Sequence, residues 1–417
     1  MAYPAIAAAQ ALPPQKSKLN ISRTLALSLP YAWLSVQISM MDGGLPVILT
    51  AAPEAGGLGL GFTAKGVVMA LDNILGLFLL PLFGALSDKS RGKWGKRTPF
   101  ILLGGVGAVA AWAAAGLALG LHAKWLFLIL LSSGLAFMQL SRPANRAILP
   151  DFTPTEHRRT ANALTEIVSI IFTALGLVLV MLFSPRGYNT IFYATVASML
   201  PLMLLFLLLV RERKWEPEQQ QEESAAGQGA PRRTRIIFLC SVFFFYISYN
   251  GLISSLSNYS VDVLGLDPAR FVLPQGLTML MACFAAVPAA KLQKKLPRKT
   301  MLLGGIGVMT AAFAVAGYQR GLTPAMFACF ALVGAGFAAV IVNLYPFQLE
   351  LTPPEKIGSS TGIFNTVMTL AMIVTPIASG ALADWKGLKT LFPYCIAALI
   401  ISFALLLLTP ERKKAQS

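Results

Sequence analysis

Long apolar runs, separated by short polar or basic segments, dominate this sequence. A helix needs about 20 mostly apolar residues to cross the hydrocarbon core of a bilayer, and twelve runs meet that length. They cover residues 25–50, 62–86, 99–121, 125–148, 161–184, 188–210, 236–260, 271–291, 299–318, 323–348, 358–381 and 388–409. The pattern predicts an all-α membrane protein with twelve transmembrane helices.

A polar stretch rich in Glu and Gln, residues 211–235, divides these runs into six and six. Such a composition is typical of a flexible linker. We therefore expect an N-terminal tail (1–24), a first six-helix bundle (25–210), the linker, a second six-helix bundle (236–409) and a C-terminal tail (410–417). The first twenty residues lack the basic-then-apolar order of a cleavable signal.

The charges are few and unevenly placed. Only 12% of the residues are charged and the mean hydropathy is +0.66, whereas a soluble domain has about 25% charged residues. The net charge of +16 suggests nucleic acid at first sight. However, with the N-terminus inside, 27 of the 34 basic residues fall on the cytoplasmic side, and the outer seven include Lys65. This positive-inside bias predicts a bacterial inner membrane protein with both termini cytoplasmic and no nucleic-acid partner.

Two loops recur in the two halves. Thr153-Pro154-Thr155-Glu156 is echoed 199 residues later by Thr352-Pro353-Pro354-Glu355, and Asp151 by Glu350. The basic sequence Lys96-Arg97-Thr98 is answered by Arg298-Lys299-Thr300, and each precedes Leu-Leu-Gly-Gly. T-P-x-E is also a helix N-cap pattern. The paired echoes predict two pseudo-symmetric bundles, a plan in which the substrate is bound between them.

The loop after the second run carries a family resemblance. Residues 84–100 read G-A-L-S-D-K-S-R-G-K-W-G-K-R-T-P-F, which resembles the loop signature of the major facilitator superfamily. Its longer form, with R-A-I-L-P-D at 146–151 and R-R-T-A-N-A at 158–163, is similar to the glycoside–pentoside–hexuronide and sucrose-transporter branch. The resemblance implies the major facilitator fold, alternating access, and sugar uptake coupled to H⁺ or Na⁺ through an acidic residue on span two.

Charged residues at the cytoplasmic ends of the spans are candidates for gating. A carboxylate at the end of span two can accept from a neighbouring helix N-terminus, and nearby arginines can pair with acids on adjacent helices. The alternative is plain positive-inside topology, which suffices for Lys93 and Lys96. The predicted gating set is Gly84, Asp88, Arg91, Arg97, Asp151 and Arg159.

Ionisable residues inside the spans are costly and usually functional. Asp72, Asp42 and Glu166 are the predicted coupling-ion residues, in that order, because a carboxylate at such depth can bind a proton or ligate sodium. For Asp42 the alternative is a solvated helix end beside Gly43 and Gly44.

Arg142 and Arg146 lie one helical turn apart in span four. An unpaired charge in low dielectric is unfavourable. We expect Glu166 or Asp151 to neutralise one of these arginines.

Amide and aromatic side chains bind sugars through hydrogen bonds and ring faces. The alternative for many of these amides is hydrogen bonding between helices in lipid. Neutral polar groups outnumber basic ones, which favours a sugar or glycoside over an organic anion. The predicted substrate-binding set is Gln37, Asn73, Arg142, Asn145, Asn162, Tyr249, Asn250, Asn343 and Asn365.

Several chemistries are not indicated. The sequence has no Walker A motif, so ATP is not expected as the energy source. Both histidines, His122 and His157, fall in loops, and no C-x-x-C pair occurs among the four cysteines. We expect neither an enzyme, a metal site nor a cofactor, and a monomer suffices. The leading hypothesis is cation-coupled symport of a sugar or glycoside. Alternatives are proton-coupled export of a drug or metabolite, and a non-transporting pigment or assembly factor.

Overall fold

The computed structural model describes residues 19–90, 94–212, 230–293, 295–319 and 321–410. In this part of the chain, twelve helices are long and apolar enough to cross a membrane. They fall in the twelve predicted runs and extend most of them by a few residues at the ends. The predicted fold class, an all-α membrane protein with six spans in each half, is confirmed.

The first six spans lie before the linker. Span one combines α1 (Ile21–Ser39), a π-helical turn η1 (Met40–Gly44) and α2 (Leu45–Thr50). The next five are α3 (Phe62–Lys89), α4 (Thr98–Gly120), α5 (Lys124–Asp151), α6 (Arg158–Phe183) and α7 (Tyr188–Leu209). Short 3₁₀ turns lie at η2 (Pro53–Ala55), η3 (Thr155–His157) and η4 (Ser184–Arg186).

The other six spans follow the linker. They are α8 (Arg232–Asp262), α9 (Leu273–Leu292), α10 (Arg298–Ala316), α11 (Pro324–Glu350), α12 (Ile357–Lys386) and α13 (Leu391–Leu407). Two 3₁₀ turns, η6 (Pro354–Lys356) and η7 (Leu388–Thr390), flank α12. Local sequence sets several ends: the Asn20 side chain accepts from the backbone N–H of Arg23 at the start of α1, and Gly387 ends α12 at φ 82°.

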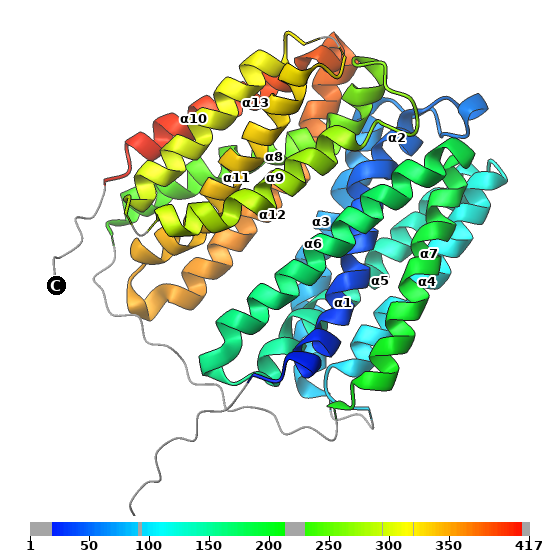
Figure 1. Cartoon of the computed structure of the whole chain (residues 1–417), viewed down its shortest axis with the longest axis horizontal. Helices are drawn as coiled ribbons and strands as arrows, with labels where there is room; N and C mark the ends of the chain where they lie inside the picture. The colour runs from blue at the N-terminus through cyan, green and yellow to red at the C-terminus, as the bar shows by residue number, and fades with distance from the viewer. Residues whose placement is uncertain (1–18, 91–93, 213–229, 294, 320, 411–417) are drawn as a thin grey trace, which may run out of the picture.

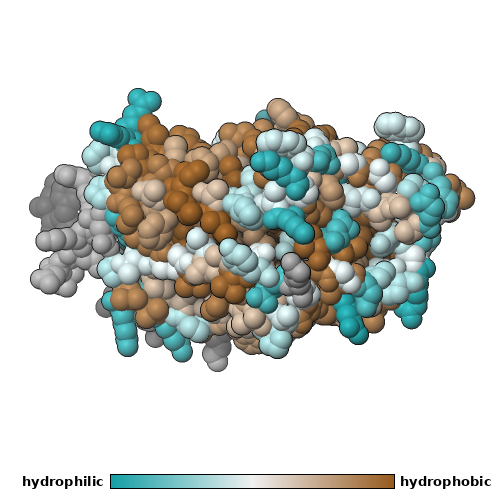
Figure 2. Space-filling model, turned by 90° about the horizontal axis from the view of Figure 1, so that it is seen from above, coloured by the Kyte–Doolittle hydropathy of each residue, from teal (hydrophilic) through white to brown (hydrophobic). Residues whose placement is uncertain are grey.

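Each half has its own apolar core. One buried cluster comes from the first half, joined by Phe271 and Val272, and the other comes from the second half alone. Figure 1 shows the two bundles side by side with their helices running roughly parallel. Large apolar side chains such as Phe78, Trp125 and Phe284 point outward, and Figure 2 shows broad apolar areas on one face. Lipid is the solvent that suits such a surface.

The two ends of the molecule differ. The end that contains the start of α1 and the connections α3–α4, α5–α6 and α11–α12 is called the basic end. The end that contains the connections α2–α3 and α8–α9 is called the opposite end. The main contact between the halves is α3 against α12, supported by α6 against α9. Near the opposite end, a Cβ added to Gly66 would lie 2.1 Å from the Pro376 carbonyl oxygen. A Cβ added to Gly380 would lie 2.2 Å from the Phe62 carbonyl oxygen. Glycines therefore permit α3 and α12 to touch backbone to backbone.

Candidate functional site: a central cavity between the halves

A polar cavity of about 680 Å³ lies between the two bundles. Span one, α3 and α5 form its wall in the first half, and α8 and α12 form its wall in the second. Its lining along α3 runs from Met69, about two turns into the helix, to Pro81, toward the basic end. The volume lies within the range of about 300–1,000 Å³ typical of small-molecule sites.

Asp72 and Arg142 form an ion pair in the cavity wall. The Arg142 Nη1 lies 3.4 Å from Asp72 Oδ2, and Gln139 Nε2 donates to Asp72 Oδ1 at 2.6 Å. Arg142 Nη1 also donates to Gln139 Oε1 at 3.2 Å. Gln139 and Arg142 are three residues apart on α5, so both reach the same point on α3. Asp72, the first-ranked coupling residue, is therefore already neutralised by an arginine.

Asp42 has a different environment. It lies in the π-helical turn η1, inside span one rather than at its end, and lines the same cavity. Among the described residues its carboxylate has neither a hydrogen bond nor an ion-pair partner within 4 Å. Single π-helical turns inside α-helices often occur at functional sites, and this one directs a free carboxylate into a polar cavity.

Other polar residues also line the cavity, among them Tyr249 of the predicted substrate set. Asn73 lies beside Asp72 on α3, and Asn250 and Asn365 face it from α8 and α12. The Asn250 Nδ2 donates to the Met372 carbonyl at 3.0 Å. Arg146, one turn beyond Arg142, also lines the cavity. Hydrogen-bonding groups therefore reach the cavity from both halves.

Four predicted substrate residues lie elsewhere. Gln37 is buried and accepts a hydrogen bond of 2.8 Å from Trp112 Nε1, which joins two helices of the first half. Asn145 and Asn343 are fully buried and are absent from the cavity lining. Asn162 is exposed on α6. The rotation of each helix about its own axis determines which of these amides face the cavity, and composition alone does not reveal that rotation.

Neither of the two acids predicted to neutralise Arg142 or Arg146 forms such an ion pair. Asp151 pairs with Arg97 instead, because both lie at the basic end, whereas Arg142 lies deeper and faces Asp72. Glu166 is exposed on α6 and interacts electrostatically with Arg146 without forming an ion pair within 4 Å.

Arg97 organises the predicted gating cluster at the basic end. Its Nε lies 2.8 Å from Asp151 Oδ2, its Nη2 lies 2.7 Å from Asp88 Oδ1, and its Nη1 donates to Ser87 Oγ at 2.6 Å. Although burial opposes its charge, hydrogen bonds to Asp151 and Asp88 hold the pKa of Arg97 above its ordinary value. These partners all belong to the first half. In this conformation the cluster therefore ties α3, α4 and α5 together and does not join the halves.

The remaining gating residues have varied positions. Gly84 faces Pro143, where an added Cβ would lie 3.7 Å from the proline Cβ. Arg159 is exposed at the start of α6. Arg91 lies outside the described residues.

Glu212, within the predicted linker, also belongs to this end. Its carboxylate accepts from the backbone N–H groups of Lys96, Arg97 and Thr98 at 2.7–3.0 Å and so caps the N-terminus of α4. Gly95 makes the approach possible, since it adopts φ 111° and a Cβ there would lie 2.4 Å from the Glu212 carboxyl carbon. The polar composition of residues 211–235 concealed this buried acid.

The sequence repeat has a structural counterpart in the second half. Arg298 and Glu350 form an ion pair between α10 and α11, as Arg97 and Asp151 do between the N-terminus of α4 and the end of α5. Basic and acidic residues of the repeated loops therefore fasten equivalent helices in each bundle, although Arg298 aligns with Lys96 rather than with Arg97 in the repeat.

Sequence reasoning missed the polar contacts at the opposite end. Asp384, at the end of α12, accepts from the backbone N–H groups of Phe62 and Thr63, each at 2.8 Å, and from Thr63 Oγ1 at 2.5 Å. An acid of the second half thus caps α3 of the first half. The first four N–H groups of a helix have no partner within it, but nothing local in the sequence links residues 62 and 384.

Lys65 is the second missed residue. The charge count placed it among the outer basic residues, yet it is 0% exposed. Its Nζ donates to Ser254 O at 3.0 Å, Ser255 Oγ at 3.2 Å and Asn258 Oδ1 at 3.3 Å, all on α8. Asn258 Nδ2 in turn donates to Thr50 Oγ1 at 2.6 Å.

The halves are joined by hydrogen bonds at one end only. Within the described ranges, every hydrogen bond between the halves involves the contacts of Asp384, Lys65 and Asn258 just given, the Asn258–Pro46 bond, or the bond from Ser184 to the Pro268 carbonyl. All lie toward the opposite end, and none lies at the basic end. On the opposite side of the central cavity, the two halves are therefore held together.

A comparison with protein families identifies this architecture. The profile of the Major Facilitator Superfamily matches residues 32–370 and, in a second match, 238–417. The chain belongs to the Major Facilitator Superfamily. It is therefore a multi-pass membrane protein of a transporter family, in agreement with its twelve spans.

Two relatives match this chain, one over most of its length and one over less than half. An uncharacterized MFS-type transporter, MJ1317 of Methanocaldococcus jannaschii, is 25% identical over 374 residues, which cover 87% of this chain and 88% of the relative. An uncharacterized MFS-type transporter of Mycobacterium tuberculosis, Rv1250, is 25% identical over 173 residues, 40% of this chain and 30% of the relative.

Solved structures share the fold at low identity. The nucleoside transporter NupG has a TM-score of 0.72 at 15% identity and covers 93% of this chain and 99% of its own. A bacterial homologue of the human lysosomal transporter Spinster has a TM-score of 0.70 at 16% identity and covers 94% and 97%. Such likeness establishes the fold alone. The sugar-transporting branch remains a prediction.

Proposed function

We propose that this secondary transporter couples the movement of a sugar or glycoside to that of H⁺ or Na⁺ by alternating access. One observation carries the proposal: a polar cavity between the halves, which are hydrogen-bonded to each other at the opposite end, contains one arginine-paired carboxylate and one free carboxylate. Neutral amides from both halves surround them.

The two carboxylates suit different tasks. Asp42 has no basic partner within 4 Å, so it is our first choice for the coupling cation. Asp72 is neutralised by Arg142 and hydrogen-bonded by Gln139, and this rigid group suits substrate hydroxyls better than a cation. We therefore rank Asp42 before Asp72, which is the reverse of the order expected from the sequence.

The position of the cavity supports the transport mechanism. A substrate that hydrogen-bonds to Asn73 and the Asp72–Arg142 pair on one side, and to Asn250 and Asn365 on the other, draws the halves together at the basic end. The contacts at the opposite end must then break. With the basic end cytoplasmic, as the charge distribution favours, this conformation is open to the cytoplasm.

The test is uptake of labelled disaccharides and monosaccharide glycosides into proteoliposomes under an imposed pH or Na⁺ gradient. We expect gradient-dependent accumulation of at least one substrate. Asp42→Asn should lower this accumulation by about tenfold or more, equivalent to at least about 1.4 kcal/mol, while substrate exchange without a gradient persists. Glu54→Gln, which removes an exposed carboxylate outside the cavity, is the matched control.

Two results would contradict the proposal. Accumulation of no sugar under either gradient would remove sugar symport, and outward movement of a drug driven by an inward proton gradient would favour export. Unchanged accumulation in Asp42→Asn would reject Asp42 as the coupling residue while leaving transport itself intact.

A further inference from the structure

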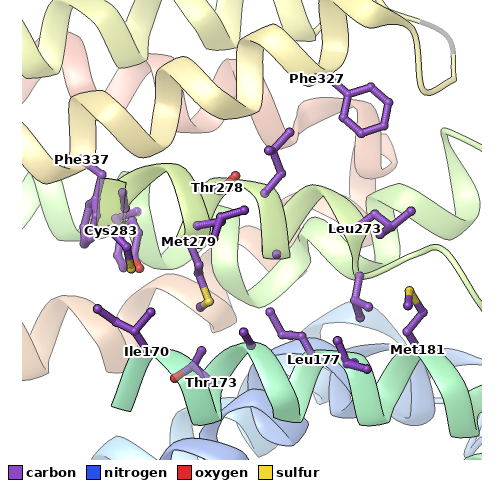
Figure 3. Close-up of a pocket in the computed structure, with 18 residues that line it drawn as sticks. Ile170, Thr173, Leu177, Met181, Leu273, Thr278, Met279, Cys283, Phe327 and Phe337 are labelled. Carbon is purple, nitrogen blue, oxygen red and sulfur yellow. The ribbon is translucent and has the colours of Figure 1, made fainter. Parts of the chain in front are cut away.

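A second cavity, of about 540 Å³, lies between the halves beside the central one. Ile170, Thr173, Leu177 and Met181 line it from one face of α6, at successive helical turns, and α9 forms the facing wall. Figure 3 shows these side chains directed toward Leu273, Met279 and Cys283. The α6 face extends for about 16 Å at a rise of 1.5 Å per residue. We refer to this second cavity as the lateral cavity.

The lateral cavity is almost entirely apolar. Its few polar side chains are Thr173, Thr278, Cys283 and Tyr249, and the Thr278 hydroxyl already donates to the Pro274 carbonyl of its own helix at 2.9 Å. A charged or hydroxylated group would find almost no partner here and would lose its hydration. An alkyl or aryl group would instead be favoured, in proportion to the area it buries.

Tyr249 connects the two cavities. It lines both of them, and its ring stacks on Phe337 with centroids 3.9 Å apart. Its hydroxyl has no hydrogen-bond partner among the described residues. A polar cavity and an apolar cavity therefore meet at one side chain with an unused hydroxyl, an arrangement suited to a single molecule with one polar and one apolar part.

We propose that the transported class is a glycoside with an apolar aglycone, whose sugar occupies the central cavity and whose alkyl or aryl group occupies the lateral cavity. This inference rests on the proposed sugar function and narrows its substrate. Because α6 and α9 belong to different halves, the aglycone contacts both halves. It therefore raises the affinity for the glycoside only in conformations in which the lateral cavity is present.

The test compares methyl, propyl and hexyl β-D-glucosides and β-D-galactosides binding to the full-length protein in lipid nanodiscs, below their micellar concentrations. In the wild type we expect affinity to rise by about two- to fourfold per added methylene. Gly276→Phe fills the lateral cavity and should flatten this dependence while methyl glycoside affinity stays within about twofold. An added Cβ fits there, since its nearest neighbour is Leu177 Cδ1 at 3.7 Å.

Two further variants make the result interpretable. Ala174→Phe fills the same cavity from α6 and serves if Gly276→Phe fails to fold. Gly304→Phe places the same side chain on α10, where an added Cβ meets nothing within 4 Å, and should keep the wild-type dependence.

The outcomes separate the two proposals. If methyl glycosides bind and a longer alkyl chain does not raise the affinity, the lateral site is rejected and sugar recognition stands. The same holds if the rise in affinity persists in both filled variants, because partitioning into the bilayer would give that result. If hexanol alone binds as tightly as hexyl glycoside, and this binding is lost in the filled variants, the cavity is a site for lipid chains only and the inference is overturned. If no glycoside binds at any chain length, the proposed function fails as well.

Discussion

Single residues act in this transporter through partners far away in the sequence. Asp72 meets Arg142 across 70 positions, and Phe62 meets Asp384 across 322. The sequence identifies Asp72 and Arg142 as charged residues that are costly inside a membrane, but it does not reveal which charges pair. That is why Asp72 ranks first from sequence, whereas the structure leaves Asp42 as the free carboxylate.

Arg97 illustrates a residue whose loss should be severe. Arg97→Gln would leave Asp151 and Asp88 without their buried guanidinium, and breaking such a pair costs about 3–5 kcal/mol of unfolding free energy. We expect a large fall in the thermal stability of the purified protein. Lys96→Gln is the control, because Lys96 is 42% exposed and lies 3.6 Å from Asp88, and exposed pairs contribute about 0–1 kcal/mol. Equal stability of the two variants would contradict the structural role of Arg97.

At the level of helices, the sequence was most informative. Lipid requires every spanning segment to satisfy its own backbone, so hydropathy alone locates the twelve spans to within a few residues. The local irregularities were not predictable in the same way. The π-helical turn Met40–Gly44 and the Glu212 cap on α4 depend on packing between helices, which hydropathy does not encode.

The contact between α3 and α12 gives a prediction at this scale. Gly380→Ala would place a Cβ 2.2 Å from the Phe62 carbonyl oxygen, so the helices must separate. Overpacking of this kind costs about 1–3 kcal/mol and should lower the unfolding temperature. Gly358→Ala on the same helix meets nothing within 4 Å and should be neutral or slightly stabilising, since Ala favours helix by up to about 1 kcal/mol. A stable Gly380→Ala protein would show that the helices do not approach so closely.

At the scale of the whole molecule, the two bundles are joined at the opposite end and free of hydrogen bonds to one another at the basic end within the described ranges. Two of the contacts that hold the opposite end are made by Asp384 and Lys65, whose side chains are absent from the lining of the central cavity, although Ser254, an acceptor for Lys65, lines it. Weakening them should therefore shift the balance of conformations without removing the substrate site. Alternating access requires this separation of the gate from the substrate site.

The most direct test measures distances across both ends in the same protein. In a variant without the four native cysteines, spin labels at positions 54 and 389 report on the opposite end, and labels at positions 160 and 359 report on the basic end. Asp384→Ala removes the cap on α3, worth about 1–2 kcal/mol, and should shift populations by about 5- to 30-fold. We expect the first pair of labels to move apart while the second pair comes together. A longer distance at the opposite end with no change at the basic end would contradict this expectation.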